Sequence, residues 1–387
     1  MAKMSELFNV EKKETYGALG RAPGSTLRSN ERVKIVYNKY SNKALNSSDQ
    51  RVKINLIFAH GTGMNKSVWS FHIKLLYEAS RLAKDWVLDK VVSVDAASHG
   101  DSALRNAGKM GWVFRWDDGA RDLISVVRHE NDTTGDFING MKAKTILIGH
   151  SMGGYMVTYA SYLEPNLFDS AVAVEPVIYS DPSMFEKYLK LFSKIKGFII
   201  DEFGDKDEVD EYFRSFSFFK TMRSEVLDEF IADEVMEVKD PDTGDVHYKA
   251  KTTSDLQFTA YISAMVSLLP MMQILPNLTI PFYNMACKTA TWNPMEAPEY
   301  INATVPEDVI HPVWLEKGSH LVHGDFPEIV VNEFTKIFSE RAKIAIESYP
   351  YYPEIRFKGQ EDKIVDHYTG HLLQGRLEEF ASFKPKL

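Results

Sequence analysis

The sequence predicts an α/β protein with a mostly parallel sheet, helices on both faces of that sheet, and a helical cap inserted between two late strands. Two observations carry this prediction. Apolar runs of strand length alternate with segments of helical periodicity, and the runs are nearly continuous, as in strands that are covered on both faces. The alternation stops at about residue 177 and resumes at about residue 276, and the segment between has helical periodicity.

The first half of the chain supplies most of the expected strands. Residues 32–41 alternate polar and apolar side chains, which indicates an antiparallel edge strand. Apolar runs that end in a small or polar turn are the expected parallel strands: 52–63, 90–102, 144–154 and the shorter 171–177. Helical patterns at 67–84 and 118–130 separate these runs.

The late part of the chain completes the pattern with strands at 279–288 and 312–320 and a helix at 327–346. Within the inserted segment, apolar residues at helical spacing predict cap helices over 185–192 and 258–269. The expected organisation is therefore an N-terminal extension (1–30), a core (31–176 and 276–350), a cap (177–275) and a C-terminal tail (351–387).

Composition excludes several classes of protein. Of the 387 residues, 44% are apolar and 12% aromatic, which suffices for a sizeable core and is too much for a disordered chain. The net charge of −9 argues against nucleic acid as the main partner. Cys287 is the only cysteine, so no disulfide can form within the chain and no thiolate metal site is available. Neither a metal nor an organic cofactor is expected. No uninterrupted apolar run has the length of a membrane span, so no transmembrane segment is expected.

The segment "GHSMGG" places Ser151 at the centre of a G-x-S-x-G pattern directly after a buried strand. This is the pattern of a nucleophile elbow, a sharp turn from a strand into a helix that displays the serine hydroxyl. Such a turn leaves no room for side chains at the flanking positions, which are Gly149 and Gly153 here. We expect Ser151 to be a nucleophile.

A serine nucleophile that attacks a carbonyl group needs donors for the oxyanion that forms. One donor is the backbone N–H that follows the serine, which belongs to Met152. The other comes from the loop after an earlier strand, and "HGTGMNKSVW" at 60–69 suits that loop. We assign the second donor to the N–H of Thr62.

The general base is expected to be a histidine late in the chain, because the chain order in enzymes with this elbow is serine, acid, histidine. His320 ends the last predicted strand, at the sheet edge where Ser151 is also displayed. His323 is the alternative, whereas His311 precedes that strand and would lie at its opposite end.

Several segments resemble a known family in content and order: "HGTGMNKSVW", "VVSVDAASHGDSALRN", "DGARDL", "IGHSMGG", "LEPNLF", "VEPV" and "GSHLV". Together with the C-terminal residues, they resemble the fungal peroxisomal α/β-hydrolases and lipases. The similarity runs from about residue 21 onward and is weakest over 180–255. It implies an α/β-hydrolase fold and an acyl-ester hydrolase with Ser151, His320 and an acid as its triad.

The resemblance implies that the acid is Glu175. The usual position after the strand at 279–288 is occupied by Thr289, Ala290 and Thr291, none of which carries a charge. Related hydrolases without that later acid place it after the strand that follows the nucleophile, where Glu175 lies. Glu296 and Asp95 remain the alternatives.

The last three residues, Pro385, Lys386 and Leu387, are close to the S-K-L address that the peroxisomal import receptor recognises, although proline departs from the usual small residue. The expected location is therefore the peroxisomal matrix, with a cytosolic pool and peripheral membrane contact left open. The expected substrate is a small lipophilic ester.

Two other functions stay open. An acyl-CoA thioesterase would use the same triad, but residues 178–250 hold 18 acidic against 10 basic side chains, which disfavours an anionic ligand. A non-catalytic peroxisomal matrix or membrane-associated protein with the same fold is the other alternative, and it predicts a broken triad.

Overall fold

The computed structural model describes residues 3–348 except residues 47, 182 and 184. Its centre is an eight-stranded sheet with the order β1-β2-β4-β3-β5-β6-β10-β11. The six strands from β4 to β11 run parallel to one another, which confirms the mostly parallel sheet. Their bounds are β3 (Val52–Ala59), β4 (Trp86–Val94), β5 (Ala143–His150), β6 (Ser170–Val174), β10 (Phe282–Cys287) and β11 (Ile310–Leu315).

The edge strand differs from the prediction. β1 (Phe8–Tyr16), which falls in the predicted N-terminal extension, pairs antiparallel with β2 (Lys34–Asn42) along its whole length. β2 in turn pairs antiparallel with β4, so β2 is the second strand of the sheet and the prediction that it forms the edge was wrong. Most side chains of β1 are polar and exposed, so its sequence lacks the alternation that reveals a half-buried strand.

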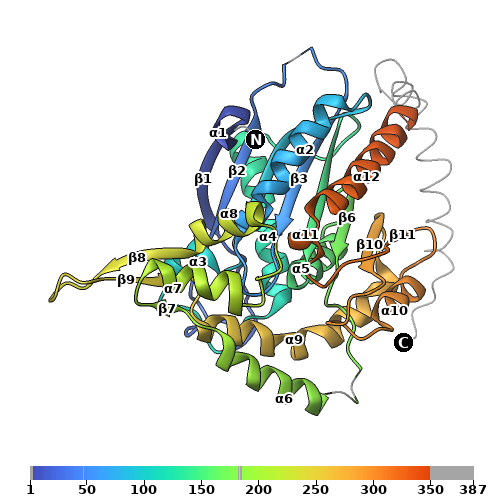
Figure 1. Ribbon diagram of the computed structural model, residues 1–387. Coiled ribbons are helices and arrows are strands. Elements are labelled where there is room, and N and C mark those ends of the chain that lie inside the picture. Colours follow the sequence, from blue (N-terminus) through green and yellow to red (C-terminus); the bar gives the residue numbers. More distant parts are fainter. Residues whose placement is uncertain (1–2, 47, 182, 184, 349–387) are drawn as a thin grey trace, which may run out of the picture.

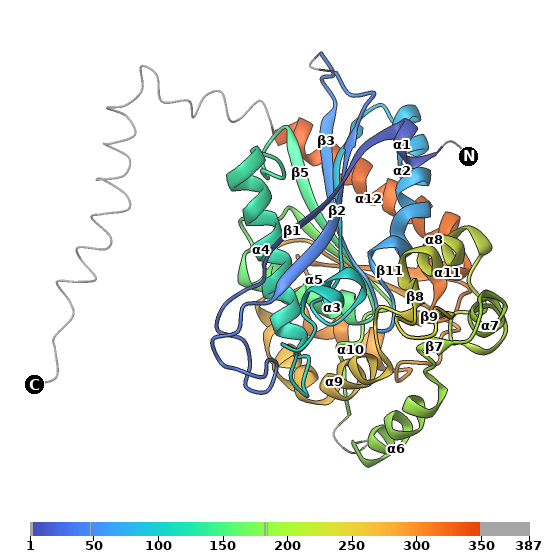
Figure 2. The ribbon, with the colours of Figure 1, turned by 90° about the vertical axis from the view of Figure 1, so that its left-hand side faces the viewer.

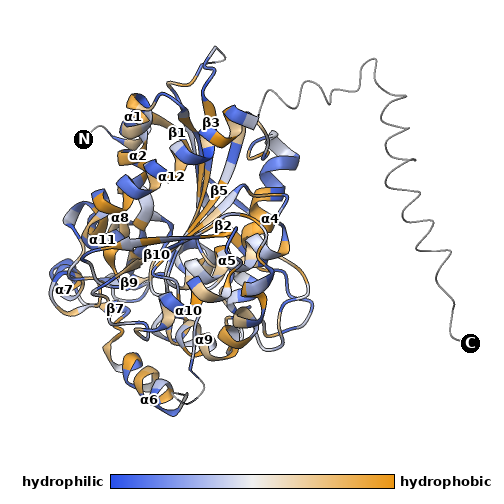
Figure 3. Ribbon diagram, turned by 90° about the vertical axis from the view of Figure 1, so that its right-hand side faces the viewer, coloured by the Kyte–Doolittle hydropathy of each residue, from blue (hydrophilic) through white to orange (hydrophobic). Residues whose placement is uncertain are grey.

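Helices cover both faces of the sheet, as predicted (Figures 1 and 2). One face packs against α2 (Ser70–Leu82) and α12 (Pro327–Ser348), and the other against α4 (Trp116–Thr134) and α5 (Met152–Leu163). Figure 3 shows that apolar residues are concentrated along the central strands between these two layers. The short helices of the core are α1 (Met4–Leu7), η1 (Lys66–Trp69), α3 (Gly100–Arg105), α10 (Ala297–Thr304) and α11 (Val322–Asp325).

In its described residues, the segment between β6 and β10 contains four α-helices, α6 (Phe185–Ile195), α7 (Lys206–Glu211), α8 (Ser224–Glu234) and α9 (Ser254–Ile274). It also contains a small antiparallel sheet with the order β7-β9-β8, which the sequence did not predict: β7 (Glu202–Phe203), β8 (Val235–Lys239) and β9 (Val246–Ala250). Short turns of helix, η3 (Lys196–Phe198), η4 (Tyr212–Phe216) and η5 (Leu275–Asn277), join these elements. Figure 1 shows α9 beneath the sheet and α6 outermost in the cap.

Within the described part of the chain, one helical stretch, Ser254–Asn277, is long and apolar enough to cross a membrane by length and composition alone. In the structure this stretch packs against α4 and α5. The hydroxyl of Ser263 accepts a hydrogen bond from the backbone N–H of Phe114 (2.9 Å), and the indole N–H of Trp116 donates to the carbonyl oxygen of Ala260 (3.0 Å). These hydrogen bonds hold α9 against the core, so this apolar helix is part of the folded domain.

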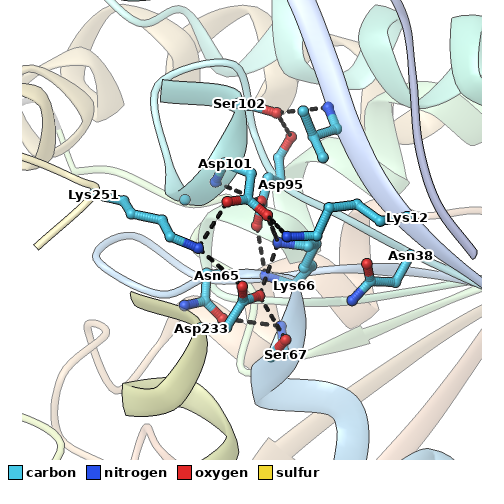
Figure 4. A network of polar contacts seen from close by, with 12 residues as sticks. Lys12, Asn38, Asn65, Lys66, Ser67, Asp95, Asp101, Ser102, Asp233 and Lys251 are labelled. Atoms are coloured by element: carbon cyan, nitrogen blue, oxygen red, sulfur yellow. Dashed lines mark hydrogen bonds and ion pairs between the residues drawn. The ribbon is translucent and has the colours of Figure 1, made fainter. Parts of the chain in front are cut away.

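A buried ion cluster holds the cap on the core (Figure 4). The ammonium group of Lys66 on η1 is fully buried and lies 2.8 Å from Asp95, 2.7 Å from Asp101 and 2.8 Å from Asp233. Asp95 and Asp101 belong to the core, whereas Asp233 belongs to cap helix α8. A charged group this deep is tolerated only because opposite charges surround it.

Two further lysines complete this Lys66 cluster. Lys251, from the cap segment between β9 and α9, contacts Asp101 at 2.7 Å and Asp233 at 3.0 Å. Lys12 of β1 contacts Asp101 at 2.6 Å. Three ammonium groups therefore balance three carboxylates, and they join the N-terminal edge strand, the core and the cap.

Candidate active site

Ser151 lies at the turn between β5 and α5, in a backbone conformation (φ 54°, ψ −114°) that residues other than glycine rarely adopt. The neighbouring glycines make this turn possible. A Cβ atom on Gly149 would lie 2.1 Å from the carbonyl oxygen of Gly153, and one on Gly153 would lie 2.2 Å from that of Ala59. The turn presents the Ser151 hydroxyl at the carboxyl end of the parallel strands, as the pattern predicts.

His320 lies in the loop between β11 and α11, and its Nε2 atom is 3.0 Å from Oγ of Ser151. In that arrangement the hydroxyl donates its hydrogen bond to the imidazole, which is the geometry for proton transfer. The alternative, His323, lies in α11 with a fully buried ring, and neither of its ring nitrogens has a hydrogen-bond partner among the described residues. The structure therefore brings His320, and not His323, to the serine.

Glu175 follows β6 directly and also has a positive φ of 46°. One carboxylate oxygen lies 3.4 Å from Nδ1 of His320, and the other accepts a hydrogen bond of 2.6 Å from the backbone N–H of Cys287. The alternatives lie elsewhere: Asp95 belongs to the Lys66 cluster, and Glu296 lines an open groove beside α6. A buried strand end accommodates Glu175 because an imidazole and a backbone N–H meet it there.

Burial controls the charge of both groups. It raises the pKa of Glu175 to about 7, although the hydrogen bonds from Cys287 oppose that rise. Burial also lowers the pKa of His320 to about 3. His320 is therefore neutral at rest and able to accept a proton, whereas the charge of Glu175 depends on pH near neutrality.

The two expected oxyanion donors belong to adjacent segments. The hydroxyl of Thr62, in the loop after β3, lies 3.5 Å from the sulfur of Met152, so the two residues touch. Met152 is the first residue of α5, where a backbone N–H has no acceptor within the helix. Among the hydrogen bonds of the described residues, none uses the N–H of Thr62.

His99 fixes the loop that carries Thr62, a role that sequence analysis did not predict. Its Nε2 atom accepts a hydrogen bond of 3.1 Å from the N–H of Gly63, the residue after Thr62. Burial lowers the pKa of His99 well below its ordinary value, so the ring stays neutral and keeps a lone pair for this bond. His99 lies 36 residues from Gly63, and no local pattern connects them.

Two other buried histidines hold the loop that carries His320. The Nε2–H of His150 donates to the carbonyl oxygen of His320 at 2.7 Å, and the Nε2–H of His72 donates to that of His323 at 2.7 Å. Burial lowers the pKa of His150 well below its ordinary value and that of His72 to about 4. Both rings therefore act as neutral donors, His150 to the loop that carries His320 and His72 to α11, which follows that loop.

A cavity of about 400 Å³ opens above Ser151 and His320. Most of the side chains that face it are apolar or aromatic, or end in a hydroxyl group. Apart from Thr62, His150, Ser151 and His320, the cavity is lined by Met64, Phe218, Phe219, Thr221, Tyr261, Thr289, Ala290, Thr291, Trp292, Gly318, Ser319 and Leu321. A site of this character accommodates a lipophilic ligand.

Two remaining predictions concern targeting and metal binding. The predicted targeting residues Pro385, Lys386 and Leu387 lie outside the described residues. Within residues 3–348 as described, no group of three or more His, Cys, Asp or Glu side chains is arranged to hold a metal ion.

Comparison with known proteins gives relatives in sequence and in structure. The chain is 29% identical over 339 residues to the peroxisomal membrane protein LPX1 of Saccharomyces cerevisiae, covering 84% of this chain and 85% of that protein. It also resembles the solved structure of the peroxisomal α/β-hydrolase Lpx1 from the same yeast, with a TM-score of 0.77 and 26% identity over 87% of this chain and 90% of that one. The type I acyl-CoA thioesterase mpaH of Penicillium brevicompactum is 29% identical over 160 residues, which are 41% of this chain and only 34% of the thioesterase.

The sequence profile of the α/β hydrolase family matches residues 56–333, which is well over half of the chain. The matched span runs from β3 to α12 and includes Ser151, Glu175 and His320. The chain belongs to the α/β hydrolase family.

Proposed function

We propose that this protein is a serine hydrolase that cleaves carboxylic esters of lipophilic acyl groups. One observation carries the proposal: His320 Nε2 lies 3.0 Å from the Ser151 hydroxyl at the floor of a mainly apolar cavity. Glu175 stands behind the imidazole, 3.4 Å from Nδ1. A serine, a neutral base and an orienting acid in this order are the parts that acyl transfer requires.

In the proposed reaction, Oγ of Ser151 attacks the ester carbonyl carbon while Nε2 of His320 takes the hydroxyl proton. The N–H groups of Thr62 and Met152 stabilise the oxyanion of the tetrahedral intermediate. The bond to the alcohol oxygen then breaks, and His320 returns the proton to the departing alcohol. A water molecule repeats these steps on the acyl-enzyme, so that the carboxylic acid is released and Ser151 is restored.

The proposed compartment is the peroxisomal matrix. Two observations support it: the C-terminal Pro385, Lys386 and Leu387, and the similarity to a yeast protein described as peroxisomal. A compartment that degrades fatty acids would provide a hydrolase with lipophilic acyl substrates.

The proposed function is tested with a fluorophosphonate probe, which labels activated serines, together with p-nitrophenyl ester hydrolysis. We expect Ser151→Ala to lose the label and at least about 10³-fold in kcat/KM, because the nucleophile is gone. Ser125→Ala is the matched control, since Ser125 on α4 does not line the cavity. Turnover in Ser151→Ala close to that of the control would refute the proposal.

One observation favours acyl-CoA thioester hydrolysis as a second candidate function. Lys187, Lys190 and Lys194 of α6 line an open groove of about 540 Å³. This groove shares Trp292 with the cavity at Ser151. Ammonium groups attract the phosphates of coenzyme A, so the basic side chains of the otherwise acidic cap lie where a CoA leaving group would need them. The groove also contains Asp181 and Glu296, which reduce its net positive charge.

The two candidates are separated by comparing decanoyl-CoA with p-nitrophenyl decanoate, which carry the same acyl group. A thioesterase should lose activity toward decanoyl-CoA in the double variant Lys187→Ala/Lys194→Ala and retain activity toward the oxygen ester. Lys220→Ala is the control, because Lys220 is exposed and outside the groove. Equal effects on both substrates would leave the oxygen-ester hydrolase as the function.

A further inference from the structure

Trp292 occupies a junction between three hollow spaces. It lies in the loop between β10 and α10, and its ring stacks on the ring of His320 with a centroid separation of 5.6 Å and an interplanar angle of 22°. The same indole lines the cavity at Ser151, the lysine groove and a third space between α6 and α9. Among the residues that the structure describes, no other lines all three of these spaces.

The third space, which we call the α6–α9 cavity, is small and apolar. Its volume is about 50 Å³, against about 400 Å³ for the cavity at Ser151. Tyr188, Leu191 and Phe192 of α6 form one wall, and Ala264, Met265 and Leu268 of α9 form the opposite wall. The rest of the lining is Val177, Tyr179, Ser180, Trp292, Asn293 and Pro294, so no charged side chain of the described chain faces this space.

The lining decides what kind of group the α6–α9 cavity accepts. A charged or strongly polar group would lose its hydration there without finding an ionic partner, which costs free energy. An alkyl chain has no hydrogen bonds to water to lose, and its burial is favourable. The lysine groove shares Tyr188, Leu191, Trp292, Asn293 and Pro294 with this cavity, but charged side chains complete its lining: Asp181, Lys187, Lys190, Lys194 and Glu296. Trp292 therefore stands where the path from Ser151 leads either to an apolar space or to a charged one.

We infer that the α6–α9 cavity is the distal part of the acyl-binding site, and that Trp292 is the partition that limits how far an acyl chain reaches from Ser151. This inference rests on the proposed ester hydrolysis and names the residue that sets its chain-length preference. Rotation or removal of the indole joins the two cavities into one apolar channel that runs from the nucleophile to α6.

The side chains around the partition allow it to change without disrupting the core. Trp292 is 39% exposed and belongs to a loop, and besides His320 its ring contacts that of Phe218, at 6.4 Å between ring centroids and an interplanar angle of 69°. Leu191 on the far wall is 44% exposed. Neither residue belongs to the buried core, so substitutions at both positions should leave the fold intact.

The first test is the ratio of kcat/KM for p-nitrophenyl dodecanoate to that for p-nitrophenyl butanoate, measured in wild type and Trp292→Ala. We expect the ratio to rise by about 10-fold in the variant, because several methylene groups gain an apolar space. A ratio removes any effect that loss of the stacked ring has on His320, since that effect applies to both esters. An unchanged ratio would overturn the inference.

The second test fills the cavity from its far side. Leu191→Trp should cancel the gain in the double variant with Trp292→Ala, because the space behind the partition is then filled. Leu189→Trp is the matched control, because Leu189 is on the same helix and 46% exposed but does not line the cavity. Equal ratios in Trp292→Ala/Leu191→Trp and Trp292→Ala/Leu189→Trp would count against the cavity as an acyl site.

Failure of the inference and failure of the proposed function give different results. If wild type hydrolyses neither ester in a Ser151-dependent way, the proposed function itself is wrong. If both esters are hydrolysed through Ser151 and the ratio is the same in all variants, only the role of Trp292 and the α6–α9 cavity is wrong.

Discussion

The Nε2–H of His150 donates a hydrogen bond of 2.7 Å to the carbonyl oxygen of His320. His150 precedes Ser151 in the chain, so this bond ties the turn that carries the nucleophile to the loop that carries the base. The His150 ring is also in contact with the ring of His323, at 3.9 Å between centroids. The relative position of Ser151 and His320 therefore depends on a residue that takes no part in proton transfer.

Replacing His150 with phenylalanine keeps a ring at this position and removes the donor. We expect kcat to fall by about 10- to 100-fold with little change in KM, since small displacements of catalytic groups cost about this much. The unpaired carbonyl group should lower the free energy of unfolding by about 1–3 kcal/mol. The measurement is ester hydrolysis together with the rate of fluorophosphonate labelling, which reports on serine activation. Wild-type labelling by the variant would show that His150 has no positioning role.

The strained backbone at Ser151 predicts a gain in stability when glycine replaces it. A residue with a side chain at φ 54° is in a region that only glycine occupies without strain, and the cost is about 1–3 kcal/mol. We expect Ser151→Gly to be inactive and to have a higher Tm than Ser151→Ala, which keeps the strain. Equal melting temperatures for the two variants would mean that the turn stores no strain.

The sequence predicts the parts of the site that depend on local backbone requirements. Gly149 and Gly153 are needed because the elbow has no room for a Cβ atom at these two positions. The position of Ser151 is therefore evident from the residues next to it in the sequence. His99 and Trp292 act through contacts with segments far away in the chain, and no periodicity or motif encodes such contacts. The edge strand β1 escaped prediction for a related reason, because its polar, exposed side chains leave pairing with β2 as its defining feature.

The Lys66 cluster is a further example of contacts, between residues far apart in the chain, that the sequence does not predict. Lys66 and Asp233 are 167 residues apart, yet their charged groups lie 2.8 Å from each other in the interior. Neither residue differs in the sequence from a solvated surface charge. Only the folded arrangement of η1 and α8 reveals that they are buried and paired.

Removing the central charge of this cluster should destabilise the protein strongly. Lys66→Met leaves Asp95, Asp101 and Asp233 facing one another without their shared partner, and we expect a loss of about 3–5 kcal/mol. Lys53→Met is the control, because Lys53 is 43% exposed and lies 3.8 Å from Asp89, and exposed pairs contribute below about 1 kcal/mol. Thermal unfolding of the two variants measures the difference, and similar Tm values would contradict this account.

The cluster also makes stability depend on acid. Burial alone would raise the pKa of Asp101, but the charge of Lys66 and hydrogen bonds from Lys12 and Lys251 hold it below the ordinary value. A lowered pKa in the folded state means that the contribution is complete above the ordinary pKa of aspartate and is lost as pH falls below it. We expect the Tm of wild type to drop below about pH 4 more steeply than that of Asp101→Asn. If the curves of Tm against pH for wild type and Asp101→Asn ran parallel, other carboxylates would be responsible for the acid sensitivity.

The C-terminal residues predict import into peroxisomes. Deleting Lys386 and Leu387 from a fusion with a fluorescent protein at its N-terminus should change punctate fluorescence to diffuse cytosolic fluorescence, because the receptor reads the terminal residues. Pro385→Ser is the matched variant and should strengthen import, since serine is the usual residue there. Punctate fluorescence that survives the deletion would show that another signal directs the protein.

The raised pKa of Glu175 predicts that activity depends on pH near neutrality. Above about pH 7 the carboxylate is ionised, accepts the Nδ1–H of His320 and stabilises the imidazolium that forms when Ser151 loses its proton. Below that pH the protonated acid carries no charge and donates to Nδ1, which leaves the remaining imidazole proton on Nε2, where it blocks transfer from Ser151. Since the pKa of His320 is about 3, protonation of the base itself falls outside this range. We therefore expect kcat/KM to rise with pH through about 7.

Glu175→Gln should lose about 10³- to 10⁴-fold in kcat and the pH dependence near 7 together, because its amide donates to Nδ1 at every pH. A rise near pH 7 that persists in Glu175→Gln would assign the titration to another group, and near-wild-type kcat in that variant would remove Glu175 from the triad.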